Sequence, residues 1–402
     1  MNINKIVQRT FPDVFDETLP STNANWWMSG SSGAGKSVTT EIIARQVLDS
    51  GGFLSIKDIG DSYKAFCNSA GGTYINGSTL KFNPFANITD DTFPRMAERV
   101  CEQLCILASP NGQLDELHES LIHECIIDSW PHYQQDMRID HVVDYLERHQ
   151  RDVGQQHSVR MAGKNDEIIT QLNKYTTHGI YGAYFNNSEP TLKRNEQFVV
   201  TEMYDLRKQS DLLAAGLLSM MLWTENLIYS TLPHQLKMDV SDGCWNMVSC
   251  TSEKIGVFIE RAHRVARRRN GSYGTVTQSL RDKNLNAAML ATYNNSAFKF
   301  TLMQDPYGFR KFRQEEPEVF SELEWRLVES FYPPRKAGYS DFLLSIDMYS
   351  SLHRIWLDSE NGITTCGKTL EEEDDPNEVL FKMAQHYPHL REVLGHLRRM
   401  EV

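Results

Sequence analysis

The sequence has no apolar run long enough to cross a bilayer. Its longest, Leu212–Trp223, is interrupted by Ser219 and followed by polar residues. A membrane span needs about 20 apolar residues, so this run predicts a buried core helix. The first 20 residues also lack the apolar segment of a secretory signal. We therefore expect no direct membrane span and a cytoplasmic protein, and we leave peripheral attachment to the inner membrane open.

Positive charge is scarce. The chain carries 41 basic and 53 acidic residues, which gives a net charge of −12. A protein that coats nucleic acid through bulk charge needs a positive surface, so this class is disfavoured. A local basic patch remains compatible with the total.

The seven cysteines form neither a CxxC pair nor a cluster with histidine at metal-ligand spacing. Cys101 and Cys105 lie four residues apart, which places them on one face of a helix. A zinc site would need further paired ligands. We expect free, buried thiols in a reducing cytosol.

What the sequence does contain is the opening of a parallel α/β sheet. The apolar stretch Asn25–Met28 leads into a glycine-rich loop, a helix to about Leu48 and a second strand at Phe53–Ile56. From about Asp91 to Asn187, apolar residues recur at helical spacing. Strands then return at Phe198–Thr201 and further along the chain.

This organisation predicts an α/β fold in five parts. These are a tail, a first part of the nucleotide-binding core, a mostly helical insertion, a second part of the core, and a C-terminal region with a helix, a strand pair and a tail helix. Their expected ranges are 1–20, 21–90, 91–195, 196–320 and 321–402. The acidic run at 371–375 is interpreted as a solvated linker.

The glycine-rich loop reads GSSGAGKS and matches the phosphate-loop pattern G-x-x-x-x-G-K-[ST] at every fixed position. Its residues are the expected nucleotide-binding set: Gly30, Ser31, Ser32, Gly33, Ala34, Gly35, Lys36 and Ser37. Glycine lets backbone N–H groups approach phosphates, and Lys36 adds a positive charge near the β- and γ-phosphates. The Ser37 hydroxyl suits Mg²⁺. A chance match within a linker is disfavoured by the flanking strand and helix.

The expected cofactors are ATP and Mg²⁺. A guanine-selecting NKxD motif is absent from the sequence, which favours ATP over GTP.

Longer strings downstream resemble the TraC-type ATPases of F-type conjugation, which belong to type IV secretion systems. They include VLDSGGF (47–53), DIGDSYK (58–64), LKFNPFANIT (80–89), ASPNGQLDELH (108–118) and ERAHRVARRRNGSYGTVTQ (260–278). The resemblance runs from about residue 20 to about 360.

The resemblance implies a RecA-like P-loop NTPase fold with a parallel-rich central sheet and a helical insertion. It also implies ATP hydrolysis that powers pilus assembly and DNA transfer, by a homo-oligomer, a hexamer, on the inner-membrane complex. Its partners would be other type IV secretion components. Members of this family carry a large N-terminal domain before the ATPase half, so we expect this chain to represent the ATPase half only.

The same resemblance locates an acidic motif at KMDVSDGCWN (237–246). Asp242 and Trp245 occupy the matching positions, while Gly243 stands where the family has a catalytic glutamate. Asp242 can serve the metal, but glycine cannot deprotonate water. Asp239 would be costly to bury in this strand. The alternative is a misplaced motif, with Phe198–Glu202 as the rival strand.

A basic helix follows this strand. Arg261, Arg264, Arg267 and Arg268 recur at helical spacing, and Arg264, Arg267 and Arg268 match the family pattern. Three interpretations stay open: a trans-acting arginine, with Arg267 in the catalytic set; a DNA contact; or a solvated basic face. Arg354 is a weaker trans-acting candidate. Gln278, at the end of a Thr-x-Thr-Gln strand, is expected to sense the γ-phosphate.

Three functions therefore remain. The first is the motor ATPase, with hydrolysis in doubt because of Gly243. The second is a truncated nucleotide-binding pseudoenzyme or modulatory subunit. The third is a DNA-translocating coupling motor, which the net negative charge disfavours.

Overall fold

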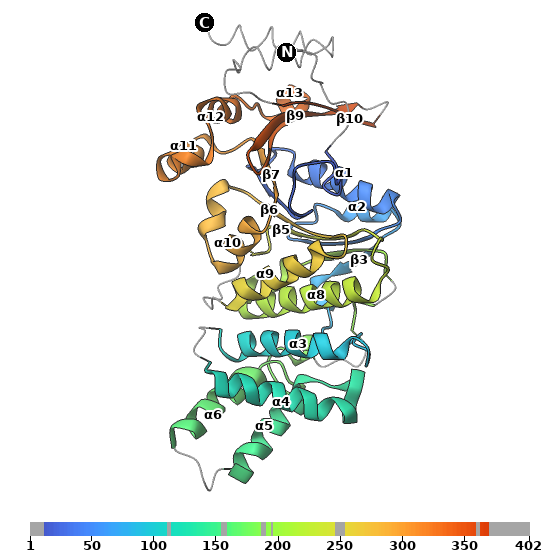
Figure 1. The fold of residues 1–402 in the computed structure, drawn as a ribbon, viewed down its shortest axis with the longest axis vertical. Coiled ribbons are helices and arrows are strands. Elements are labelled where there is room, and N and C mark those ends of the chain that lie inside the picture. Colours follow the sequence, from blue (N-terminus) through green and yellow to red (C-terminus); the bar gives the residue numbers. More distant parts are fainter. Residues whose placement is uncertain are drawn as a thin grey trace, which may run out of the picture. The chain divides into compact units, whose positions relative to one another are not determined.

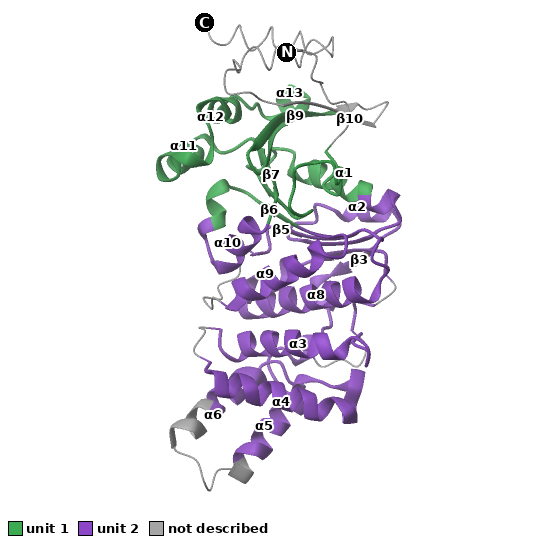
Figure 2. Ribbon diagram, viewed as in Figure 1, with its two compact units in different colours: residues 1–46, 274–283, 296–402 green, residues 47–273, 284–295 purple. Residues whose placement is uncertain are grey.

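The computed structural model describes residues 12–110, 114–153, 159–185, 190–193, 196–245, 254–358 and 362–369. The chain forms two compact units (Figure 2). Unit 1 comprises residues 1–46, 274–283 and 296–402, and unit 2 comprises residues 47–273 and 284–295. The expected final helix and the acidic run lie outside the described residues.

Unit 1 is built around the strand that leads into the glycine-rich loop. This strand, β1 (Trp26–Ser29), pairs in parallel with β6 (Gly271–Thr277) through residues 274–277, and on its other side with β7 (Phe298–Leu302). Every residue of β1 is buried. A strand with two parallel neighbours is covered on both faces, which explains its unbroken apolar run.

An antiparallel extension continues from β7. The strands β8 (Tyr339–Ile346), β9 (Tyr349–Asp358) and β10 (Gly362–Thr369) give unit 1 the order β10-β9-β8-β7-β1-β6. The sequence predicted β8 and β9 but not β10. Three more helices follow β7 in this unit, and the first two contribute Phe309, Phe312 and Trp325 to a common apolar cluster. They are α11 (Pro306–Glu315), α12 (Glu322–Glu329) and α13 (Pro334–Ala337).

Unit 2 contains four parallel strands in the order β5-β2-β4-β3. Parallel neighbours need crossover connections, which the intervening helices supply. In chain order these strands are β2 (Phe53–Asp58), β3 (Thr73–Asn76), β4 (Phe198–Glu202) and β5 (Lys237–Asp242). Short helix α2 (Lys64–Ser69) connects β2 to β3.

Helices cover these strands in successive layers (Figure 1). The first layer holds α8 (Ser210–Ser230) and α9 (Lys254–Arg267), with α10 (Ala287–Asn294) against α9. Helix α3 (Phe93–Ala108) contacts both α8 and α9. The insertion continues with α4 (Glu116–Tyr133), α5 (Ile139–Val153), α6 (Val159–Asn173) and α7 (Gly182–Phe185). The insertion is mostly helical, as its apolar spacing predicted.

Helix α8 is the longest apolar element of unit 2. By length and composition alone it could cross a membrane, but 94% of its apolar window is buried inside the structure. Helix α8 contacts both α3 and α9 within this unit. The buried core helix predicted from the sequence is therefore present.

Candidate nucleotide site

The phosphate-loop sequence folds as a strand, a tight loop and a helix within unit 1. Strand β1 ends at Ser29, and α1 (Lys36–Asp49) begins at Lys36. The loop needs glycine because Gly33 and Gly35 have φ angles of +77° and +98°. A Cβ on Gly35 would also lie 2.5 Å from Ser340 Oγ, so the backbone is too closely approached for a side chain there.

Neighbouring strands hold this loop in place. The Gly30 N–H donates to the Thr277 carbonyl at 3.2 Å, and the Ser31 N–H donates to the Met303 carbonyl at 2.8 Å. The Ser340 hydroxyl donates to the Ala34 carbonyl at 2.7 Å. The loop is therefore anchored by the last residue of β6, the residue after β7 and the second residue of β8, and it needs little reorganisation to receive phosphates.

Lys36 reaches back across the loop. Its Nζ donates to the carbonyls of Gly30 at 2.7 Å and Ser31 at 3.1 Å. Ser37 is the second residue of α1 and is half-buried. The N-terminal end of a helix carries partial positive charge, which adds to the attraction for an anion. This segment therefore combines a glycine-rich loop, an ammonium group, a hydroxyl and a helix N-terminus.

Gln278 lies directly beside the loop. The register pairs Ser29 with Thr277, so Gln278 follows the last paired residue of β6. The Asp282 carboxylate accepts hydrogen bonds from the Thr277 hydroxyl and from the backbone N–H groups of Gln278 and Ser279. This turn fixes the backbone of Gln278 and leaves its side chain exposed. Its assignment as a γ-phosphate sensor stays a prediction.

A second glutamine near the loop was missed in the sequence. Gln304 is buried; its Nε2 donates to the Leu302 carbonyl at 2.9 Å, and its Oε1 accepts from the Leu280 N–H at 3.3 Å. The amide also lies 3.5 Å from Ser29 Oγ. The available signal in the sequence was the position of Gln304, a polar residue two positions after the end of β7.

Arg354 lies in a different environment from an exposed arginine finger. Its guanidinium is 3% exposed and forms a bidentate pair with the Asp341 carboxylate. It also stacks over the Tyr339 ring at 3.6 Å. These contacts give Arg354 a role in joining β8 and β9, and a trans-acting role would require it to leave them.

Three carboxylates form a row at the carboxyl ends of neighbouring strands in unit 2. The register pairs Asp58 at the end of β2 with Glu202 at the end of β4. On the other side, Lys57 pairs with Ser241, so Asp58 and Asp242 are the next residues along β2 and β5. The sequence predicted Asp242, but the alignment of all three depends on strand order.

Burial and charge affect these carboxyl groups unequally. Burial, with the charges of Asp242 and Glu202 added, raises the pKa of Asp58 to about 7, although the Ser62 N–H partly opposes this. Glu202 instead accepts backbone N–H groups from Gly60, Asp61 and Tyr204. Glu202 therefore closes the turn after β2. These bonds give the carboxylate of the rival strand a structural role.

Asp242 and Gly243 end β5. The Tyr63 hydroxyl donates to Asp242 Oδ2 at 2.8 Å, which orients the carboxylate. Gly243 has φ +69°, and a Cβ placed on it would meet no atom within 4 Å. A Cβ at this position would therefore have room, but its backbone would adopt the left-handed conformation that L-residues disfavour. The next residues, Cys244 and Trp245, are buried.

The polar residues of β5 are accommodated by partners. Asp239 is 2% exposed and forms an ion pair with Lys57 of β2, which is fully buried. The Lys237 ammonium donates to the carbonyls of Leu232 at 2.8 Å and Arg269 at 3.1 Å. The cost expected for Asp239 is therefore offset by a lysine that the strand pattern did not link to it.

The α9 arginines separate into two groups. Arg261 is engaged by Glu98 and Glu102 of α3, and Arg264 pairs with Glu260 on its own helix. Arg267, the last residue of α9, and Arg268, which follows the helix, are exposed. Their assignment as trans-acting or DNA-contacting residues stays a prediction.

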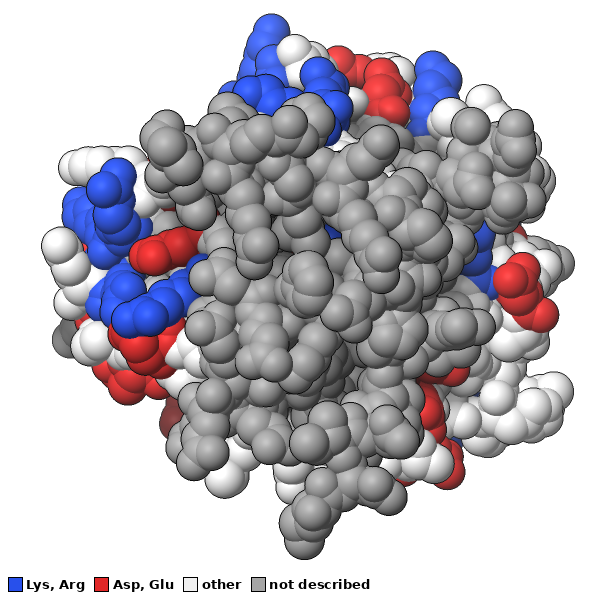
Figure 3. All heavy atoms as spheres, turned by 90° about the horizontal axis from the view of Figure 1, so that it is seen from above, with Lys and Arg blue, Asp and Glu red and all other residues white. Residues whose placement is uncertain are grey.

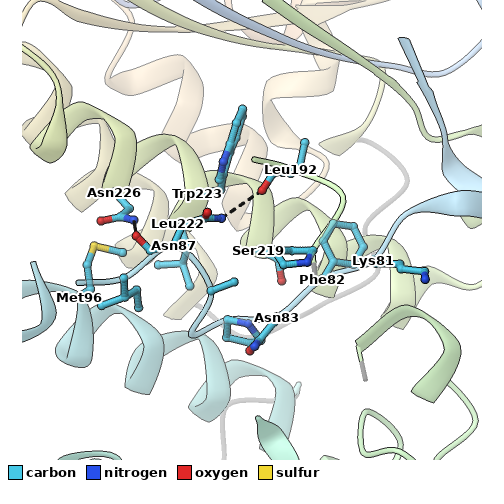
Figure 4. Close-up of a pocket in the computed structure, with 14 residues that line it drawn as sticks. Lys81, Phe82, Asn83, Asn87, Met96, Leu192, Ser219, Leu222, Trp223 and Asn226 are labelled. Atoms are coloured by element: carbon cyan, nitrogen blue, oxygen red, sulfur yellow. Dashed lines mark hydrogen bonds between the residues drawn. The ribbon is translucent and has the colours of Figure 1, made fainter. Parts of the chain in front are cut away.

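A small cavity in unit 2 lies between α8 and the segment at 81–88 (Figure 4). Its volume is about 20 Å³. Asn226 donates to the Asn87 carbonyl at 2.6 Å, and Asn87 donates to the Leu192 carbonyl at 3.0 Å. No described residue pairs with the buried Asn83 Nδ2 or Asn226 Oδ1. The cavity suits an ordered water and is too small for a nucleotide.

Comparisons with known proteins agree with this geometry. The family model described as the TraG P-loop domain matches residues 8–328. Protein TraC of Escherichia coli K12 is 39% identical over 354 residues, which cover 87% of this chain and 40% of TraC. The chain thus spans about two fifths of that relative's length.

Solved structures share the fold. VirB4 of Thermoanaerobacter pseudethanolicus superposes with a TM-score of 0.63 at 17% identity, covering 84% of this chain and 91% of that one. The plasmid coupling protein TrwB, solved with an ATP analogue, gives 0.51 at 12% identity, with 87% and 86% covered. The RecA-like P-loop fold and the resemblance to TraC-type conjugative ATPases are confirmed. The chain belongs to the TraG P-loop family and is a TraC-like member of it.

Proposed function

We propose that the chain is the ATP-binding motor subunit of a type IV secretion and conjugation apparatus, powering pilus assembly and DNA transfer. The observation that carries the proposal is the anchored phosphate loop, with Lys36 across it, in a chain that matches TraC over 87% of its length. In this proposal the protein works in the cytoplasm, peripheral to the inner membrane. Its partners are other type IV secretion components and further copies of itself, as a hexamer.

The residues fit ATP and Mg²⁺. The left-handed glycines at 33 and 35 leave the loop without side chains where phosphates would approach. Ser37 and Asp242 supply hydroxyl and carboxylate oxygens, which are the ligands that Mg²⁺ prefers. TrwB structures with an ATP analogue and with ADP and Mg²⁺ support this choice. Bound Mg²⁺ would neutralise phosphate charge.

The chain's own groups divide the remaining tasks. Lys36 and the loop amides bind and orient the phosphates, and Tyr63 holds Asp242 in orientation. Gln278 senses the γ-phosphate. Arg267 acts on the nucleotide of a neighbouring copy, with Arg264 and Arg268 beside it and Arg354 as the weaker candidate.

In ATP hydrolysis, the step for which this chain lacks a residue is deprotonation of the attacking water. Gly243 provides no carboxylate to deprotonate the attacking water, and losing a positioned general base costs about 10²- to 10⁴-fold in rate. We therefore propose that the chain retains Mg-ATP binding while hydrolysis is slow.

Gly243 also favours a second candidate function. A nucleotide-binding pseudoenzyme, or a subunit that modulates an intact copy, would need the phosphate loop and no catalytic base. The motor ATPase and the pseudoenzyme differ in the rate of ATP hydrolysis and not in ATP binding. The coupling-motor alternative has only the fold similarity to TrwB in its favour.

Calorimetric titration of the purified chain with ATP and Mg²⁺ tests the proposal. We expect saturable binding that the Lys36→Ala variant loses. Lys174→Ala, which removes an ammonium paired with Asp211 instead, is the matched control and should bind normally. A chain that binds no nucleotide would refute both candidate functions.

A further inference from the structure

The buried side chain of Gln304 is a polar group of unit 1 that the proposed nucleotide site does not use. It follows β7 by two residues and is 7% exposed. Its amide is engaged at both ends, since Nε2 donates to the Leu302 carbonyl at 2.9 Å and Oε1 accepts from the Leu280 N–H at 3.3 Å. Nε2 also lies 3.5 Å from Ser29 Oγ. One side chain therefore bridges the end of β1, the end of β7 and the turn after β6.

The segments that Gln304 bridges are the ones that hold the phosphate loop and Gln278. Ser29 ends β1 and precedes Gly30, whose N–H donates to the Thr277 carbonyl at 3.2 Å. The other end of the bridge lies in the turn that carries Gln278. All of these residues belong to unit 1. The loop and the turn are therefore joined twice, once through the backbone and once through a buried amide.

A second side chain fixes the same turn from within. The Asp282 carboxylate accepts from the N–H groups of Gln278 at 3.2 Å and Ser279 at 3.1 Å. A buried amide is costly to leave unpaired, so Gln304 resists any movement that would break its hydrogen bonds. The backbone of Gln278 is thus held in one place, while its side chain stays exposed.

Discrimination between ATP and ADP has to come from local contacts of this kind. ATP carries more negative charge than ADP, and the chain has a net charge of −12, so the long-range field favours ADP. On the face shown in Figure 3, basic and acidic side chains lie interspersed outside the grey residues. A preference for ATP therefore requires polar groups that are fixed close to the γ-phosphate.

We propose that Gln304 is a positioning residue that holds Gln278 where its amide can contact the γ-phosphate. The inference rests on the proposed function, because it needs a nucleotide in the phosphate loop. Gln304 is buried and acts through Gln278, so its loss should weaken the binding of ATP and leave the binding of ADP unchanged. A side chain that only stabilised the fold would change both affinities equally.

Calorimetric titration of the purified chain with Mg-ATP and with Mg-ADP tests this proposal. Gln304→Met keeps an unbranched side chain and removes both hydrogen-bonding groups. It should weaken ATP binding about 10-fold, the effect of losing one hydrogen bond to a charged group, and leave ADP binding unchanged. Gln278→Ala should give the same result. The double variant should bind ATP no more weakly than either single variant, because both substitutions remove the same contact.

Two further variants complete the design. Gln314→Met makes the same substitution at an exposed position of α11 and should bind both nucleotides like the wild type. Gln304→Glu keeps the oxygen that accepts from the Leu280 N–H, so adding Gln278→Ala to it should still weaken ATP binding about 10-fold. This second comparison decides the matter where circular dichroism shows that Gln304→Met is unfolded.

The possible failures are distinguishable. A wild type that binds neither nucleotide would overturn the proposed function, and this inference with it. A wild type that binds both, while Gln304→Met lowers the two affinities equally or adds its effect to that of Gln278→Ala, would overturn the inference alone. So would a Gln304→Glu variant in which Gln278→Ala no longer affects ATP binding.

Discussion

The buried ion pair between Lys57 and Asp239 offers a quantitative test of how the acidic strand is built. Both side chains are essentially inaccessible, and they join β2 to β5 close to the carboxylate row, with Lys57 one residue before Asp58 and Asp239 three residues before Asp242. Removing one partner leaves an uncompensated buried charge, which costs about 3–5 kcal/mol. Lys57→Met and Asp239→Leu should each lower the free energy of unfolding by that amount.

The double variant separates charge from packing. With both charges gone, Lys57→Met/Asp239→Leu should lie near the wild type or above it, since apolar replacement of a buried pair is neutral or stabilising by about 1–4 kcal/mol. Urea unfolding followed by circular dichroism measures all four proteins. Single variants that cost less than about 1 kcal/mol, or a double variant as unstable as the sum, would refute this reasoning.

Two further predictions concern the site. Burial raises the pKa of Asp58 to about 7, so folding takes up a proton between pH 4 and 7 and wild-type stability falls as pH rises through that window. Without Mg²⁺, Asp58→Asn should therefore stabilise the chain by roughly 2–3 kcal/mol more at pH 8 than at pH 5 in urea unfolding, and an equal effect at both would contradict the shift. Gly35→Ala should weaken ATP binding about 10-fold or more in calorimetry, because φ is +98° and Ser340 is in the way. Gly51→Ala, at φ +73° with open space, is its control and should bind normally.

The phosphate loop and the α/β alternation could be predicted because their signals are local. GSSGAGKS needs its glycines wherever it occurs, and the apolar strand before it and the helix after it are neighbours in sequence. Between residues 91 and 187, apolar residues recur at helical spacing, and this local pattern likewise indicates the buried face of each helix. The α/β class, β1, α1 and the buried helix α8 all followed from such patterns.

The remaining features depend on long-range pairing. The carboxylate row requires the order β5-β2-β4, which brings together residues more than 100 positions apart. The predicted second strand ended at Ile56, whereas β2 continues through Lys57 to Asp58, and only the pairing with β5 brings Asp239 to that lysine. Arg354 was predicted as a weaker trans-acting candidate, and its partner Asp341 comes from the neighbouring strand β8. No local pattern encodes these partners, so the sequence alone made the burial of Asp239 look costly and did not identify the partner of Arg354.

The central claim is that Gly243 limits hydrolysis and not binding. The direct measurement is steady-state phosphate release from Mg-ATP by the wild type, Gly243→Glu and Gly243→Ala, each shown by calorimetry to bind ATP. A Cβ at this position meets no atom within 4 Å, and the left-handed backbone costs about 1–2 kcal/mol in both variants. The account predicts slow turnover in the wild type, about 10²-fold faster turnover in Gly243→Glu and no gain in Gly243→Ala. Rapid wild-type turnover that Lys36→Ala abolishes, or a folded, ATP-binding Gly243→Glu that is no faster, would contradict it.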